Sequence, residues 1–119
     1  MDVRSLADAE SFVTADGSTI RELFGLPKGG VEHQSLAEAT LAPGQVTQRH
    51  YHRVSEEIYF VLDGEGEMDV DGEKRRVSAG DAVAIPAGAW HELRAEGDRP
   101  LRILCSCAPP YRHEDTFFE

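Results

Sequence analysis

Two histidines stand two residues apart at His50 and His52, followed by Glu57 and, further along, by His91. In an extended strand, residues two apart point to the same side and lie about 7 Å apart, so both imidazoles can contact one ion. If the chain turns after His52 and returns as the next strand, Glu57 can reach the same ion. Three imidazole nitrogens and a carboxylate oxygen suit Fe, Mn, Ni, Co, Cu or Zn and suit Ca or Mg poorly. The sequence therefore predicts a site for one divalent transition metal, with His50, His52, Glu57 and His91 as ligands.

The elements that must position these residues are short strands. Alternating or apolar runs are cut at close intervals by Gly, Pro and Asp, which is typical of an antiparallel barrel or sandwich. Only the first dozen residues, around Leu6, Ala7 and Glu10, favour a turn of helix, and Arg21 to Phe24 is compatible with either state. The expected strands are Thr19 to Leu23, His33 to Leu41, Val46 to His52, Glu57 to Asp63, Gly66 to Val70, Glu73 to Val77, Ala82 to Ile85, His91 to Ala95 and Leu101 to Cys107.

One turn is specified by its residue types. Asp71-Gly72 lies between two of the expected strands, and both residues tolerate the positive φ that a two-residue primed turn requires. Further turns are expected at the other Gly-centred corners and at Ile85-Pro86-Ala87-Gly88, where the proline presets φ. The pattern predicts antiparallel hairpins.

Length and charge limit the function classes. The chain has 119 residues and a formal net charge of −10, which favours one domain and argues against binding to nucleic acid or to an anionic membrane. No apolar run approaches the roughly 20 residues that span a bilayer, and the first residues lack a signal-peptide pattern. We therefore expect a cytoplasmic protein, with no nucleic acid or membrane among its partners.

The histidines belong to a longer spaced pattern. A glycine, five residues, His-x-His, four residues, a glutamate, six residues and a glycine correspond here to Gly44, His50, His52, Glu57 and Gly64. Glu56 competes with Glu57 as the ligand. Strand alternation favours Glu57, because it places Glu57 on the same side as the expected pocket residue Tyr59 and turns Glu56 outward.

A second spaced pattern surrounds the last histidine. It consists of Gly80, Pro86, Gly88 and His91, and ends at Ala95. Together the two patterns resemble the signature motifs of the cupin superfamily, with nine of ten fixed positions matched and Ala95 standing where the family has asparagine. The chain is most similar to small single-domain cupins often described as mannose-6-phosphate-isomerase-like.

The resemblance implies a fold and a domain organisation. The fold would be all-β, an antiparallel double-stranded β-helix, or jelly-roll barrel. Residues 1–32 would form an N-terminal extension with edge strands, residues 33–108 the barrel, and residues 109–119 a C-terminal tail. The resemblance also implies a metal bound by His50, His52, Glu57 and His91. The family motif has six residues between its glutamate and the following glycine, a spacing that Glu57 satisfies and Glu56 does not.

Several functions are compatible with such a site. Four protein ligands on a six-coordinate metal leave two positions for water or a chelating oxygen compound. The first hypothesis is a metal-dependent enzyme of dioxygenase or isomerase/lyase type acting on an oxygen-rich small molecule, with Tyr59 as a proton donor or substrate contact and Glu57 also able to act as a base. A non-catalytic module that binds or senses a small ligand is the alternative. A storage or scaffold role is the third.

Other conspicuous residues have simpler interpretations. We expect His33 and His113 to lie outside the site, and Cys105 and Cys107 to be small core residues on one face of the last expected strand.

The chain also carries features of a subunit interface. The run Tyr59 to Leu62 is apolar on both sides, and the tail ends in Phe117 and Phe118, whereas Glu114 and Asp115 should be solvated. Exposed strand edges and apolar faces are commonly covered by a second copy, so we expect a homodimer.

Overall fold

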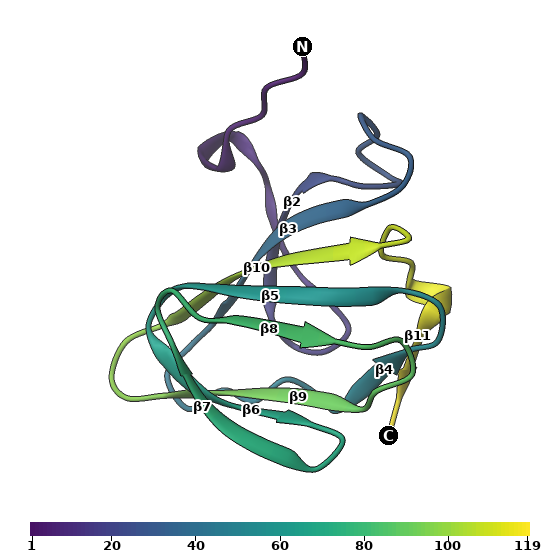
Figure 1. Ribbon diagram of the computed structural model, residues 1–119. Helices are drawn as coiled ribbons and strands as arrows, with labels where there is room; N and C mark the ends of the chain where they lie inside the picture. Colours follow the sequence, from purple (N-terminus) through teal and green to yellow (C-terminus); the bar gives the residue numbers. More distant parts are fainter.

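Two antiparallel sheets face each other across an apolar core in the computed structural model, which describes residues 1–119 (Figure 1). The six-stranded sheet has the order β1-β2-β3-β10-β5-β8. Its strands are β1 (Ser11–Val13), β2 (Thr19–Phe24), β3 (Ser35–Leu41), β10 (Leu101–Ala108), β5 (Glu56–Asp63) and β8 (Ala82–Ile85). This confirms the expected all-β jelly-roll fold.

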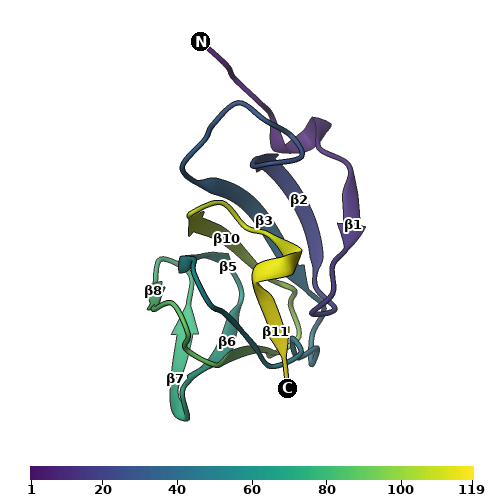
Figure 2. The same cartoon turned by 90° about the vertical axis from the view of Figure 1, so that its right-hand side faces the viewer.

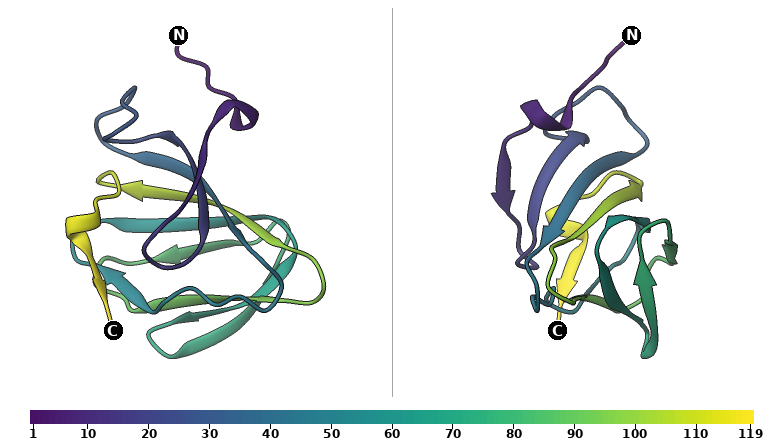
Figure 3. Two further views of the ribbon diagram at one scale, coloured as in Figure 1. Left: turned by 180° about the vertical axis from the view of Figure 1, so that it is seen from behind. Right: turned by 90° about the vertical axis from the view of Figure 1, so that its left-hand side faces the viewer.

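The second sheet has five strands in the order β11-β4-β9-β6-β7. These are β11 (Thr116–Phe118), β4 (His50–His52), β9 (His91–Glu96), β6 (Glu65–Val70) and β7 (Glu73–Ser78). Figure 2 shows β11 lying between the side formed by β1, β2 and β3 and the side formed by β6 and β7. The N-terminal segment and the loop between β2 and β3 project together at one end of the barrel (Figure 3).

Alternation along the strands fills the space between the sheets. In β5 the even-numbered residues Ile58 and Phe60 face outward and are 52% and 40% exposed, whereas Tyr59 and Val61 are buried. The same alternation on the other strands builds one continuous core, whose least exposed apolar members are Leu41, Val61, Ile85, Leu93, Ala95 and Leu101. Ala95, which replaces the asparagine of the cupin motif, is thus a core residue.

Most of the expected strands are present with ends shifted by one or two residues. The main difference is the expected strand Val46 to His52, of which only His50–His52 is a regular strand. The preceding residues follow β9 irregularly, with the Thr47 amide donating to the carbonyl oxygen of Leu93 and only an isolated bridge at Val46. His33 also lies outside β3 and is exposed.

The segments at the two ends contain short elements, most of which the sequence patterns did not predict. β1 and β11 are three-residue strands, and the ends also contain 3-10 turns at Leu6–Asp8 and His113–Asp115. The first of these turns agrees with the helical turn expected near Leu6. The ambiguous segment Arg21 to Phe24 is part of strand β2.

No helix of the structure combines the length and the apolar character that a membrane crossing would need.

The predicted turn at Asp71-Gly72 is present and is tied to the site. Asp71 has φ 51° and Gly72 has φ 89°, as a primed turn between β6 and β7 requires. The amide of Asp71 donates to the carbonyl oxygen of Trp90 at 2.7 Å, and its carboxylate accepts from the Trp90 amide at 2.8 Å. This turn therefore fixes the backbone immediately before His91.

Candidate metal centre

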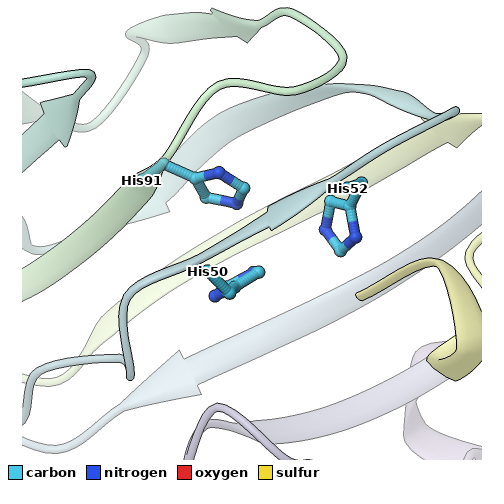
Figure 4. Close-up of side chains that lie close together, drawn as sticks. All are labelled: His50, His52 and His91. Atoms are coloured by element: carbon cyan, nitrogen blue, oxygen red, sulfur yellow. The ribbon is translucent and has the colours of Figure 1, made fainter. Parts of the chain in front are cut away.

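Strands from both sheets bring the predicted site residues together. His50 and His52 lie on β4, His91 opens β9 directly opposite His50, and Glu57 is the second residue of β5 in the facing sheet. All four side chains are buried. The imidazoles offer nitrogen atoms within 4.8 Å of one another and point toward a common space (Figure 4). Glu56, the competing carboxylate, is exposed.

Glu57 completes the cluster from the opposite sheet. Its Oε1 atom lies 3.3 Å from Nε2 of His52 and 3.4 Å from Nε2 of His91. Its other oxygen, Oε2, accepts a hydrogen bond from the thiol of Cys107 at 3.2 Å. Cys107 stands opposite Glu57 in the register of β10 and β5, so sheet pairing brings the thiol to the carboxylate.

Hydrogen bonds on the far side of each ring orient the imidazoles. Nδ1 of His50 lies 2.7 Å from the carbonyl oxygen of Gln48, and Nδ1 of His91 lies 2.9 Å from that of Ala89. A carbonyl oxygen can only accept, so both Nδ1 atoms carry the proton and both Nε2 atoms present a lone pair. Such outer hydrogen bonds are typical of histidines that bind metals.

The third ring is oriented by the C-terminal segment. Nδ1 of His52 lies 3.2 Å from Oγ1 of Thr116, whose hydroxyl donates to the carbonyl oxygen of Arg112 at 3.0 Å. The hydroxyl of Thr116 has only one proton, which it donates to Arg112, so its oxygen accepts a hydrogen bond from Nδ1 of His52. Nε2 of His52 therefore faces inward with a lone pair.

Two atoms at the centre of the cluster have no hydrogen-bond partner. They are Oε1 of Glu57 and Nε2 of His91, and both are buried. A carboxylate oxygen facing imidazole lone pairs is repulsive unless a proton or a cation lies between them, and buried polar groups without partners are uncommon in folded proteins. The donor set therefore fits a transition-metal ion of the N/O-binding type.

The electrostatics of the cluster without a metal follow from the same contacts. Burial alone would raise the pKa of Glu57, but the facing His52 and His91 outweigh burial and lower it to about 2. Burial opposes protonation of His52, yet Glu57 reverses this effect and raises its pKa. Burial and the charge of His91 lower the pKa of His50. Without a metal, the Glu57 carboxylate thus favours the charged form of His52.

A pocket adjoins the cluster between the two sheets. His50, His52, Glu57 and Tyr59 form part of its lining, and the enclosed volume is about 90 Å³. Burial and the nearby Glu57 charge raise the pKa of Tyr59 well above 10, so its hydroxyl keeps its proton at neutral pH. Tyr59 therefore occupies the pocket position that strand alternation predicted.

The two cysteines lie on the predicted inward face of β10. Cys107 is buried, and Cys105 lines the pocket. Burial and the Glu57 charge raise the pKa of both thiols above the ordinary range. They therefore remain protonated, and Cys107 can donate its proton to Glu57.

The C-terminal segment contributes to the site in ways that the sequence analysis missed. Phe118 packs on His50 with ring centroids 5.5 Å apart, and Phe117 stacks on Tyr51 of the same chain. The carboxylate of Asp115 accepts hydrogen bonds from the amides of Val54 and Ser55, a role that the expectation of a solvated side chain did not include. Its pKa is lowered because these hydrogen bonds outweigh its partial burial.

The sequence did not predict these roles, because the C-terminal segment contains no recognisable motif. His33 and His113 are exposed and lie outside the cluster, as expected.

Comparison with known proteins places this geometry in a family. The cupin domain family matches residues 37–107. An uncharacterized protein of Methanocaldococcus jannaschii is 48% identical over 107 residues, covering 88% of this chain and 84% of that protein. Gentisate 1,2-dioxygenase 1 of Aquipseudomonas alcaligenes is 39% identical over 104 residues, which cover 81% of this chain but 29% of that enzyme.

A solved structure agrees over nearly the whole chain. The polyketide cyclase RemF of Streptomyces resistomycificus superimposes with a TM-score of 0.79 and 25% identity, covering 97% of this chain and 89% of that one. With the family match spanning more than half of the residues, this chain belongs to the cupin family.

Proposed function

We propose that this chain is a metal-dependent enzyme that acts on a small molecule bound through oxygen atoms. In this proposal one divalent transition metal is held by His50, His52, His91 and Glu57. The observation that carries it is the buried Oε1 atom of Glu57, which lies unpartnered beside the Nε2 atoms of His52 and His91. A cation at this position would satisfy all of these atoms together.

The chain's own residues prepare the site for such an ion. Hydrogen bonds to Nδ1 hold each imidazole with Nε2 turned inward, and the thiol of Cys107 holds one oxygen of Glu57 so that the other faces the rings. Preorganised ligands of this kind raise metal affinity because little ordering remains to be done on binding.

The reaction class follows from what the site would offer. When bound, the metal supplies a Lewis acid with positions left open for chelating oxygen atoms, and iron in this role supports dioxygen chemistry. We propose a dioxygenase or an isomerase/lyase, in keeping with the activities for which the similar gentisate dioxygenase and polyketide cyclase are named. Tyr59, on the pocket wall, would hold a proton for the substrate, and Glu57 would serve as a second proton acceptor.

Elemental analysis of protein purified without chelator tests the metal. We expect about one equivalent of iron, manganese, nickel, cobalt, copper or zinc in the wild type and none in the His50→Ala/His91→Ala double variant. The His33→Ala/His113→Ala variant is the matched control, because both of these side chains are exposed. Wild-type protein that neither carries nor takes up a metal overturns the proposal.

Turnover separates an enzyme from a binding module. Metal-loaded protein should consume dioxygen with a chelating diol, or should convert a hydroxycarbonyl compound without consuming dioxygen. Ligand binding that shifts the metal spectrum without any product would favour the non-catalytic module instead.

We also propose that the chain forms a homodimer through the outer face of β5. Ile58 and Phe60 are 52% and 40% exposed there, in the interior of the six-stranded sheet rather than at its edge. Burying such side chains against a second copy removes apolar area from water, which is the usual driving force for association.

A further inference from the structure

The pocket beside the cluster has mainly apolar walls. They are formed by side chains from both sheets and from the C-terminal strand, including Phe12, Ile20, Ala39, Leu41, Ile103 and Phe118. The pocket volume of about 90 Å³ is smaller than the cavity of about 150 Å³ that holds benzene in an engineered core. The part of a ligand that enters this pocket is therefore compact.

Apart from the histidines of the cluster, the charged side chains on the walls all have one sign. No lysine or arginine lines the pocket, whereas Asp16 and Glu22 do, in addition to Glu57 in the cluster. Ile20 and Glu22 are two residues apart on β2 and both line the pocket. Partial burial raises the pKa of Glu22, which agrees with a position at the pocket wall. The net charge of −10 adds to the same field.

Three hydroxyl groups on the walls take part in hydrogen bonds within the protein. Ser18 donates to Asp16 at 2.6 Å. Thr47 accepts from a backbone amide of β9, and Ser35 accepts from a backbone amide that follows β10, each at 2.9 Å. These contacts hold the pocket walls together.

We propose that this pocket selects compact ligands with an uncharged, apolar body and rejects those whose body carries a carboxylate or phosphate. The inference rests on the proposed function, which assigns the oxygen-bearing end of the ligand to the metal. A second anionic group deeper in the pocket would lose its hydration without gaining a cationic partner, and it would face carboxylates. An apolar group in the same place would contact apolar walls and release water.

Matched pairs of small phenols test the selection. 4-Methylcatechol and 3,4-dihydroxybenzoate share a chelating diol and differ by a methyl group in place of a carboxylate. 4-Methylphenol and 4-hydroxybenzoate repeat this difference without a chelating group. Calorimetry on metal-loaded protein measures the first pair, and an NMR titration of metal-free protein measures the second.

We expect the methyl compound of each pair to bind at least tenfold more tightly than the carboxylate. The second pair decides the inference, because no metal takes part in its binding. If 4-hydroxybenzoate binds to metal-free protein as tightly as 4-methylphenol does, the inference is overturned. Failure of the protein to take up metal would instead overturn the proposed function and leave the result of the second pair intact.

A charge reversal on the wall provides the complementary test. Glu22→Lys should raise the affinity for 4-hydroxybenzoate at least tenfold and leave that for 4-methylphenol within twofold of wild type. Glu32→Lys makes the same charge change at a side chain that is 88% exposed, outside the pocket lining. Equal gains in both variants would mean that the net charge, and not the pocket wall, controls selection, and would overturn the inference.

Discussion

Thr116 fixes the tautomer of His52. Its hydroxyl oxygen lies 3.2 Å from Nδ1 of His52, while its proton is donated to the carbonyl oxygen of Arg112. The backbone places it there, because Thr116 stands opposite His52 in the register of β11 and β4. A residue close to the C-terminal end of the chain thus determines which nitrogen of a central imidazole carries a lone pair.

Thr116→Val should weaken binding of the proposed metal by about tenfold, because loss of an outer hydrogen bond to a ligating histidine commonly costs 10- to 100-fold. Thr116→Ser keeps the hydroxyl and should stay close to wild type. Competition against a coloured chelator measures both affinities, and thermal melting of the metal-free proteins checks that the fold is intact. Equal affinities for the valine and serine variants would exclude this role for Thr116.

Cys107 should position Glu57 through its thiol. Cys107→Val removes the donor and leaves Oε2 of Glu57 buried without a partner, so we expect a loss of about 1–3 kcal/mol in stability and weaker metal binding. Cys107→Ser retains a donor and should recover most of both. Cys105→Val is the matched control, since that thiol lies on the same strand face. Urea unfolding and chelator competition measure the two effects, and matching losses in Cys107→Val and Cys105→Val would contradict the prediction.

Asp115 should make stability depend on pH. Its pKa is lowered in the folded state, so its contribution is present above the unfolded value of about 3.9 and disappears as the pH falls through the folded value. Asp115→Asn should therefore be less stable than wild type by about 1 kcal/mol at pH 7, a modest figure because this side chain is largely exposed to solvent screening. Urea midpoints of the two proteins should converge as the pH falls below the unfolded value, and a difference independent of pH would argue against this assignment.

Phe60 tests the proposed dimer. Wild-type protein at micromolar concentration should sediment with twice the mass of one 13.1 kDa chain, and Phe60→Glu should sediment as a single chain because a charge would be buried at the interface. Val3→Glu, at a side chain that is 79% exposed near the N-terminus, is the control. A wild-type mass near that of one chain would rule out the dimer.

Much of the framework was predictable because local chemistry specifies it. Asp71-Gly72 can form a primed turn whatever surrounds it, and alternation along β5 correctly separated Glu57 and Tyr59 from outward-facing Glu56. The spacing of His50 and His52 on one strand face likewise brought both rings to the same cluster.

Features that depend on long-range packing were not predictable. β1 and β11 are too short to show a periodic pattern, and β11 exists because it pairs with β4. The contact between Thr116 and His52 joins residues 64 positions apart and leaves no trace in either local sequence. The position of Glu22 in the pocket lining was not predictable either, because a single acidic residue in an alternating strand does not show that the residues around it line a pocket.

The turn at Asp71-Gly72 limits how this scaffold can be engineered. An added Cβ at Gly72 would meet no atom within 4 Å, so the turn looks like a convenient place for an inserted peptide or a shortened hairpin. Yet both backbone hydrogen-bonding groups of Trp90 are bound by Asp71, and the next residue is His91. Loop grafting at this turn would thus disturb the buried cluster, whereas we expect the loop between β2 and β3, which projects at one end of the barrel, to accept foreign sequence without doing so.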